Sequence, residues 1–189
     1  VYTCADVASY TPAMTNEKLD DVVAMCDDII ESGKFDLSDP YLSKFIPENG
    51  PHIKDFIYVM PYDRATQQGM TYARFWTHRS GNKGFYGVDL PNSVAGNFAY
   101  NPEFADKFSL TGDDRNEQIL RGPLYVRDPS TYKATSTPWI VDGVHVTLTR
   151  EIELKDLPTL DVGNDLKGRS QGYRSIKFYM DLKTTKAQN

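Results

Sequence analysis

The sequence predicts an α+β fold, in which a helical hairpin is followed by a loop-rich region with short strands. Apolar residues repeat at helical spacing as far as Gly33, whereas several segments in the second half of the chain alternate apolar and polar residues. Glycine and proline, with 13 and 11 residues, interrupt the rest of the chain often. We therefore expect a single domain, with the hairpin at residues 1–33 and a mixed region carrying the candidate site at residues 34–189.

The composition is that of a folded globular protein, with 40% hydrophobic and 25% charged residues. The net charge is −5 and the basic residues are scattered, which argues against nucleic acid as a partner. No apolar run approaches the roughly 20 residues that span a bilayer, so we expect no membrane insertion by these residues themselves. The chain begins without methionine, within an apolar-periodic segment, and we expect it to be an internal fragment or a processed product.

Two helices are expected at the beginning of the chain. Residues 1–10 have the pattern of a helix end, and a second helix has Thr15 or Asn16 as its N-cap and finishes at Gly33. The apolar positions of the second helix are Leu19, Val22, Val23, Cys26, Ile29 and Ile30. A short connection predicts that the helices lie antiparallel and share an apolar face. Cys4 and Cys26 are then either buried thiols or a disulfide between neighbouring helices.

The mixed region is expected to contain short elements. A turn or short helix is predicted at residues 39–45 and a further helix at residues 101–108, where Asn101 is the N-cap. Strands are predicted at residues 55–60, 70–76, 119–126, 141–154 and 173–182.

A catalytic constellation is not evident in the sequence. His52, His78 and His145 are far apart and lack metal-ligand spacing, and nucleotide-binding and serine-hydrolase motifs are missing. We therefore expect no metal, no cofactor and no catalytic residues. Among the acidic residues, Asp113 and Asp114 are followed by Arg115, whose charge lowers a carboxylate pKa, so we interpret this group as an ion pair that stabilises a turn.

The aromatic content, with 12 Tyr, 9 Phe and 2 Trp, suits a ligand that is both ring-shaped and hydroxylated, although a tyrosine-rich core is an alternative explanation. In a strand at residues 70–76, alternation would place Tyr72, Arg74 and Trp76 on one face. An exposed Trp76 would stack on a sugar while nearby side chains donate hydrogen bonds; the alternative is a buried Trp76. The predicted ligand-binding residues are Trp76, Tyr72, Arg74, Arg79, Asn82 and Tyr86. Trp139 is predicted to lie in the core.

Short motifs follow one another along the chain in a distinctive order. They lie at residues 4–10, 23–37, 41–49, 55–60, 101–108, 113–115, 120–122 and 172–181, the last of which contains Gly172, Arg174, Lys177 and Asp181. Their order resembles that of the SusD/RagB family of nutrient-binding lipoproteins. The chain departs from the family pattern at residues 92–96, which match its substrate loop only loosely, and at Asp55, where the family has Glu.

The resemblance implies that the chain is the middle of a mostly α-helical protein, with tetratricopeptide-like helices outside it. It implies a lipoprotein of Bacteroidetes, anchored at the extracellular face of the outer membrane and active in starch or other polysaccharide utilisation. Such proteins capture oligosaccharides and deliver them to a TonB-dependent SusC-like transporter. The alternatives are a peptide-binding transporter lid of the RagB type and, least favoured, a glycoside hydrolase that uses a pair such as Asp89 and Asp114.

Overall fold

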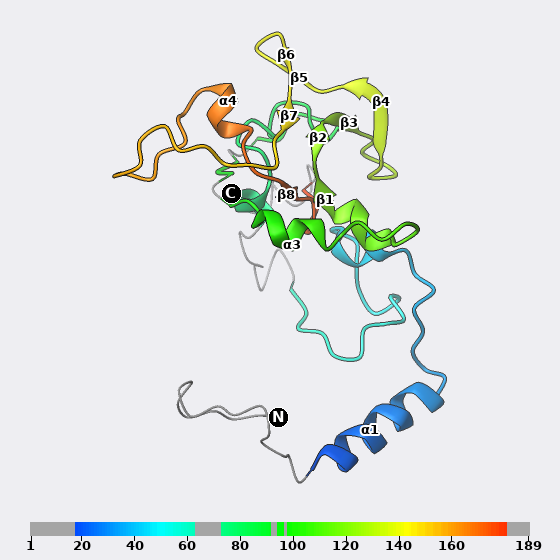
Figure 1. The fold of residues 1–189 in the computed structure, drawn as a ribbon. Coiled ribbons are helices and arrows are strands. Elements are labelled where there is room, and N and C mark those ends of the chain that lie inside the picture. The colour runs from blue at the N-terminus through cyan, green and yellow to red at the C-terminus, as the bar shows by residue number, and fades with distance from the viewer. Residues whose placement is uncertain (1–17, 63–72, 92–93, 97, 181–189) are drawn as a thin grey trace.

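The computed structural model describes residues 18–62, 73–91, 94–96 and 98–180 of the chain. Within them, short helices and small antiparallel sheets are joined by long irregular connections (Figure 1). In this part of the chain no helix is both long and apolar enough to cross a bilayer. The helix predicted at residues 1–10, and with it the hairpin and Cys4, lies outside the described residues.

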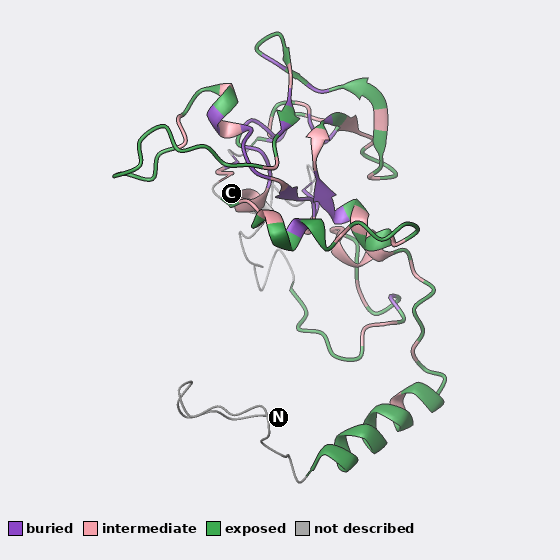
Figure 2. Cartoon of the chain, viewed as in Figure 1, coloured by how far each residue is buried: buried purple, intermediate pink, exposed green. Residues whose placement is uncertain are grey.

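Helix α1, Leu19–Glu31, confirms the helix predicted before Gly33. Gly33 has a φ of +64°, a conformation that glycine adopts without a steric penalty. No residue of α1 is buried, and most of its apolar side chains, including Val23 and Ile30, are exposed on a helix that stands away from the strands (Figure 2). Cys26 is a free and exposed thiol, so the prediction of a buried or disulfide-bonded thiol is wrong there: no described element packs over this helix.

Residues 41–60 connect α1 to the rest of the chain. The 3-10 helix η2, Tyr41–Phe45, confirms the short helix predicted there, and its Lys44 forms an ion pair of 2.7 Å with the largely buried Asp55. The strand predicted at residues 55–60 is wrong. A strand needs a neighbour to accept its backbone hydrogen bonds, and no other described segment pairs with these residues, so they form turns that expose Ile57 and Tyr58.

Short strands form antiparallel pairs in the second half of the chain. The pairs are β1 (Ile119–Leu120) with β8 (Arg174–Ser175), β2 (Gly122–Pro123) with β7 (Thr147–Leu148), β3 (Tyr125–Arg127) with β4 (Ala134–Pro138), and β5 (Ile140–Val141) with β6 (Val144–His145). They confirm parts of the strands predicted at residues 119–126, 141–154 and 173–182. The β5–β6 hairpin turns at Asp142 and Gly143, which both have the positive φ that a type I′ turn requires.

The hydrophobic core lies where these strands meet residues 85–90 and Val94 (Figure 2). Its largest side chains include Phe85, Tyr86 and Trp139. Trp139 is 2% exposed, its ring centroid is 4.9 Å from that of Phe85, and its Nε1 donates to the carbonyl of Lys83 at 3.0 Å. The prediction that Trp139 belongs to the core is therefore confirmed.

Arg174 in β8 is a buried cation that connects separate backbone segments. Its guanidinium donates to the carbonyls of Gly96 at 2.7 Å, Phe98 at 2.5 Å, Gln171 at 3.0 Å and Arg169 at 3.3 Å. Arg169 is the last residue of α4, Leu166–Arg169. Burial lowers the pKa of Arg174 to about 10, so the side chain stays charged at neutral pH.

Gly172 allows the same two segments to come together. Its φ is +77°, and a Cβ at this position would lie 2.5 Å from the Cβ of Ala99. One residue on, the Tyr100 amide donates to the carbonyl of Tyr173 at 2.8 Å. The segment that carries Phe98 and Tyr100 is thus held against residues 172–174.

Replacing Arg174 by methionine should lower the free energy of unfolding by about 3 kcal/mol or more, because several buried carbonyls lose a charged donor. Urea denaturation measures the change. Arg79→Met is the matched control, since Arg79 is exposed and its guanidinium donates to the side chain of Asn164. It should change stability by less than about 1 kcal/mol. Equal effects of the two substitutions would contradict the connecting role of Arg174.

His78 is a second buried group on which this region depends. Its Nδ1 accepts from the Ser80 amide at 3.1 Å, and its Nε2 lies 3.0 Å from the Ser170 hydroxyl, which itself donates to the carbonyl of Leu166. This arrangement fits a neutral ring with its proton on Nε2. Burial, together with the charges of Arg174 and Arg169, lowers the pKa of His78 to about 3.

Stability should therefore fall as the pH drops below 6.5. The unfolded chain takes up a proton at His78 near that pH, whereas the folded chain resists protonation down to about pH 3, so acid favours unfolding. Between pH 7.5 and pH 5 the loss should be about 2 kcal/mol, at about 1.4 kcal/mol per pH unit.

Urea denaturation at several pH values measures this slope. The slope should disappear in His78→Gln and persist in His52→Gln, because His52 is exposed. A slope that is unchanged in His78→Gln would show that other groups cause it.

Candidate functional site

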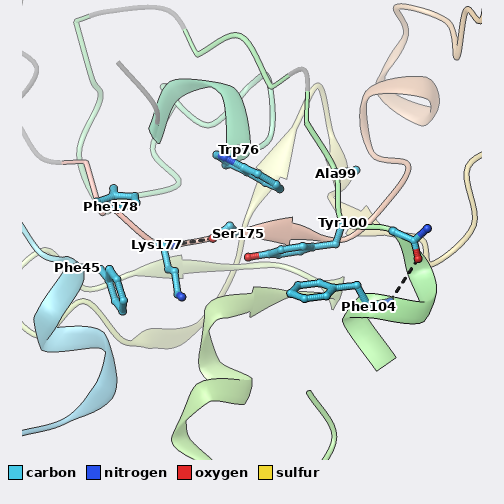
Figure 3. A pocket seen from close by; sticks show the side chains of 9 residues that line it. Phe45, Trp76, Ala99, Tyr100, Phe104, Ser175, Lys177 and Phe178 are labelled. Atoms are coloured by element: carbon cyan, nitrogen blue, oxygen red, sulfur yellow. Dashed lines mark hydrogen bonds between the residues drawn. The ribbon is translucent and has the colours of Figure 1, made fainter. Parts of the chain in front are cut away.

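A hollow of about 480 Å³ lies between η2, the short helix α2 (Ala73–Trp76), the helix α3 (Pro102–Asp106) and the chain that follows β8 (Figure 3). Aromatic side chains dominate its lining. The lining residues are Phe45, Trp76, Ala99, Tyr100, Asn101, Phe104, Ser175, Lys177 and Phe178. A volume of this size falls within the range of small-molecule sites in proteins.

Three aromatic rings follow one another along one wall of the hollow. The ring centroids of Trp76 and Tyr100 are 5.1 Å apart, and those of Tyr100 and Phe104 are 5.4 Å apart in a stacked arrangement with an interplanar angle of 28°. Trp76 and Tyr100 are half-buried and Phe104 is 45% exposed, so all three keep accessible surface. We call this row the aromatic wall.

Local backbone contacts fix the aromatic wall. Asn101 is the N-cap of α3: its side-chain oxygen accepts from the amides of Glu103 at 3.0 Å and Phe104 at 3.3 Å, which confirms the helix start predicted at this residue. On the α2 side, the Phe98 amide donates to the carbonyl of Phe75 at 2.9 Å. Both ends of the segment that carries Tyr100 are therefore hydrogen-bonded to a helix.

The opposite wall consists of Phe45 and Phe178, whose ring centroids are 5.6 Å apart in an edge-to-face contact. The Tyr179 amide donates to the carbonyl of Phe45 at 2.8 Å and joins the two segments. Lys177 extends between the walls, with its Nζ 4.5 Å from the ring centroid of Phe45 and 5.0 Å from that of Tyr41. Figure 3 shows this lysine between Phe45 and the rings of Tyr100 and Phe104.

Of the six predicted ligand-binding residues, Trp76 lines the hollow and Tyr72 lies outside the described residues. The strand predicted for residues 70–76 is wrong at its described end, because residues 73–76 are helical. Residues two positions apart in a helix are roughly 200° apart around its axis, so Arg74 does not share the face of Trp76. Its carbonyl instead accepts from the amides of Ala95 and Gly96.

Arg79, Asn82 and Tyr86 are also placed away from the hollow. Arg79 is exposed and bonds to Asn164, and Asn82 is half-buried beside the core. Tyr86 is 1% exposed and packs against Phe85 and other core aromatics, and burial raises the pKa of its hydroxyl. The prediction of Tyr86 as a ligand contact is thus corrected: its ring has no surface left for a ligand.

The sequence interpretation missed most of the lining residues. One part of the signal was present, because a helix was predicted at residues 101–108, which contain the lining residues Asn101 and Phe104. Proximity was not predictable: Phe45, Tyr100 and Lys177 are far apart along the chain and meet only through the backbone contacts described above.

The acidic residues that the sequence analysis named as an ion pair or as a catalytic pair lie outside the hollow. Asp113 accepts from the Arg115 guanidinium at 2.9 and 2.5 Å, and these hydrogen bonds lower the pKa of Asp113, which confirms the ion pair predicted at the start of η3 (Asp114–Gln118). Asp89 and Asp114 are exposed and do not line the hollow. Across the described ranges, no three histidine, cysteine or acidic side chains cluster closely enough to hold a metal ion.

No protein-family model matches this chain, and neither the curated proteins nor the solved structures contain a match to it. The resemblance to the SusD/RagB family therefore rests on the ordered motifs alone.

The N-cap of α3 should stabilise the aromatic wall. Asn101→Ala removes the acceptor for two amides and should lower the free energy of unfolding by about 1 kcal/mol, as measured by urea denaturation. Asn101→Ser is the control, because serine caps a helix comparably and should restore most of the loss. If the two variants were equally stable, the cap would not contribute to this wall.

Proposed function

We propose that this chain is part of a non-catalytic, cell-surface glycan-binding protein, which captures oligosaccharides and delivers them to a TonB-dependent SusC-like transporter. The single observation that carries the proposal is the aromatic wall of Trp76, Tyr100 and Phe104 along an open hollow. The ordered motifs that resemble the SusD/RagB family support the same function from the sequence.

The chemistry of a pyranose suits this wall. One face of the ring is formed by C–H groups, which pack on an aromatic face, while the hydroxyls project sideways and need hydrogen-bond partners. Asn101 uses its side-chain oxygen as the helix cap, which leaves its Nδ2 group to donate, and Lys177 supplies further donors.

The expected affinity is modest. An aromatic contact contributes about 1 kcal/mol beyond the burial of area, and the partly exposed wall buries only one side of a ligand. Modest affinity suits a protein that passes its ligand onward. The transporter partner and the lipid anchor at the extracellular face of the outer membrane belong to this proposal through the family resemblance.

The peptide-binding alternative uses the same hollow, because a peptide side chain or terminus can also contact aromatic rings and an ammonium group. The two ligand classes are therefore separated by titration. The glycoside hydrolase hypothesis requires a carboxylate pair at the bound sugar, whereas the pair named for it, Asp89 and Asp114, lies outside the lining.

Trp76→Ala should weaken oligosaccharide binding at least about tenfold, because the wall loses its largest ring. Calorimetric titration of the whole chain against a panel of soluble oligosaccharides and short peptides measures the effect. Phe104→Ala, at an exposed position, should weaken binding in the same direction without affecting the core.

Tyr58→Ala is the control, since Tyr58 is 85% exposed and lies outside the hollow. Its binding should equal that of the unaltered chain. Binding of peptides alone, or release of shortened sugars from the panel, would contradict the proposed function.

A further inference from the structure

The described lining of the hollow combines apolar walls with one charged side chain. Of the nine described residues that line the hollow, eight are uncharged at neutral pH, and the ninth is Lys177. The lysine is half-buried, and its backbone amide donates to the Ser175 hydroxyl at 3.1 Å, which fixes the start of the side chain. The ammonium group is therefore presented to whatever the hollow binds.

Two cations close to Lys177 have carboxylate partners. Lys44 is paired with Asp55 at 2.7 Å, and Arg115 is paired with Asp113 at 2.5 Å. In the part of the chain that the structure describes, no carboxylate lies within ion-pair distance of the Lys177 Nζ.

Aromatic faces hold the ammonium group in place. The centroids of Phe45 and Tyr41 are 4.5 and 5.0 Å from its Nζ, which are distances of favourable cation–π contacts. These contacts orient the group but use none of its three N–H donors, which a strongly hydrated ammonium keeps satisfied by water or by an acceptor. A ligand that displaces this water has to replace the hydrogen bonds and, if it is neutral, leaves the charge without a counterion.

We propose that the hollow selects saccharides that carry an anionic group, a carboxylate or a sulfate, and that Lys177 determines this selectivity. The inference rests on the proposed function and names the class of glycan. An anion on a sugar that stacks on Tyr100 and Phe104 would form charge-assisted hydrogen bonds with the ammonium across the hollow (Figure 3). Since the chain carries a net charge of −5, its overall field repels anions, and Lys177 supplies the local attraction.

The test compares matched ligands. A panel of uronate oligosaccharides is titrated into the whole chain by calorimetry, each beside the neutral oligomer obtained by reducing its carboxyl groups, with sulfated oligosaccharides and acidic peptides as further arms. At least one acidic saccharide should bind about tenfold or more tightly than its neutral counterpart, and added salt should weaken only the acidic ligand. The sulfated arm distinguishes the two anionic groups.

Substitutions separate this inference from the proposed function. Lys177→Met keeps an unbranched side chain beside Phe45. It should bring the affinities for the acidic saccharide and its neutral counterpart close to equal, while the neutral ligand still binds. Lys177→Arg should keep a clear preference for the acidic saccharide. Trp76→Ala should weaken both ligands. Circular dichroism verifies that the variants are folded.

The possible failures are distinguishable. Equal binding of acidic and neutral saccharides by the unaltered chain would overturn the selectivity and leave glycan binding intact. A preference that survives in Lys177→Met would assign it to another group and overturn the role of Lys177. Binding of acidic peptides without any saccharide would overturn both the selectivity and the proposed function.

Discussion

The contacts of the buried Arg174 guanidinium are the constraint on which the candidate site depends. Irregular segments bury carbonyl groups that have no strand partner, and each such group is costly unless it accepts a hydrogen bond. Arg174 donates to the carbonyls of Gly96 and Phe98 in the segment that leads to Tyr100 and to that of Gln171 in its own segment, while Gly172 lets the two segments approach closely. A region with little regular structure thereby holds its aromatic side chains in a fixed arrangement.

The site follows from this arrangement and from two short helices. The Asn101 cap positions Phe104 beside Tyr100, and the contact of Phe98 with α2 places Trp76 at the other end of the row. Facing them, Phe45 and Phe178 leave the ammonium of Lys177 between two apolar walls. In the function that we propose, stacking on these rings supplies affinity for a ring-shaped ligand, and the charge of Lys177 supplies discrimination among such ligands.

Local patterns predicted those elements that local interactions determine. The helical spacing before Gly33, the cap at Asn101 and the ion pair of Asp113 with Arg115 were all evident from the sequence. Features that need a distant partner were predicted poorly. The apolar run at residues 55–60 does not form a strand, because no described segment pairs with it. Trp76 lies on a helix and not on the predicted strand, and Tyr86 is buried in the core. Sequence spacing alone also gives no sign that residues 45, 100 and 177 meet.

The most direct test of sugar binding at the aromatic wall is tryptophan fluorescence during titration with the tightest-binding oligosaccharide. Trp76 lines the hollow and Trp139 is 2% exposed in the core, so the two tryptophans report on different places. Stacking on the wall predicts a saturable change in emission that disappears in Trp76→Phe and remains in Trp139→Phe. A saturable change that persists in Trp76→Phe would place the ligand elsewhere and contradict the aromatic wall as the binding site.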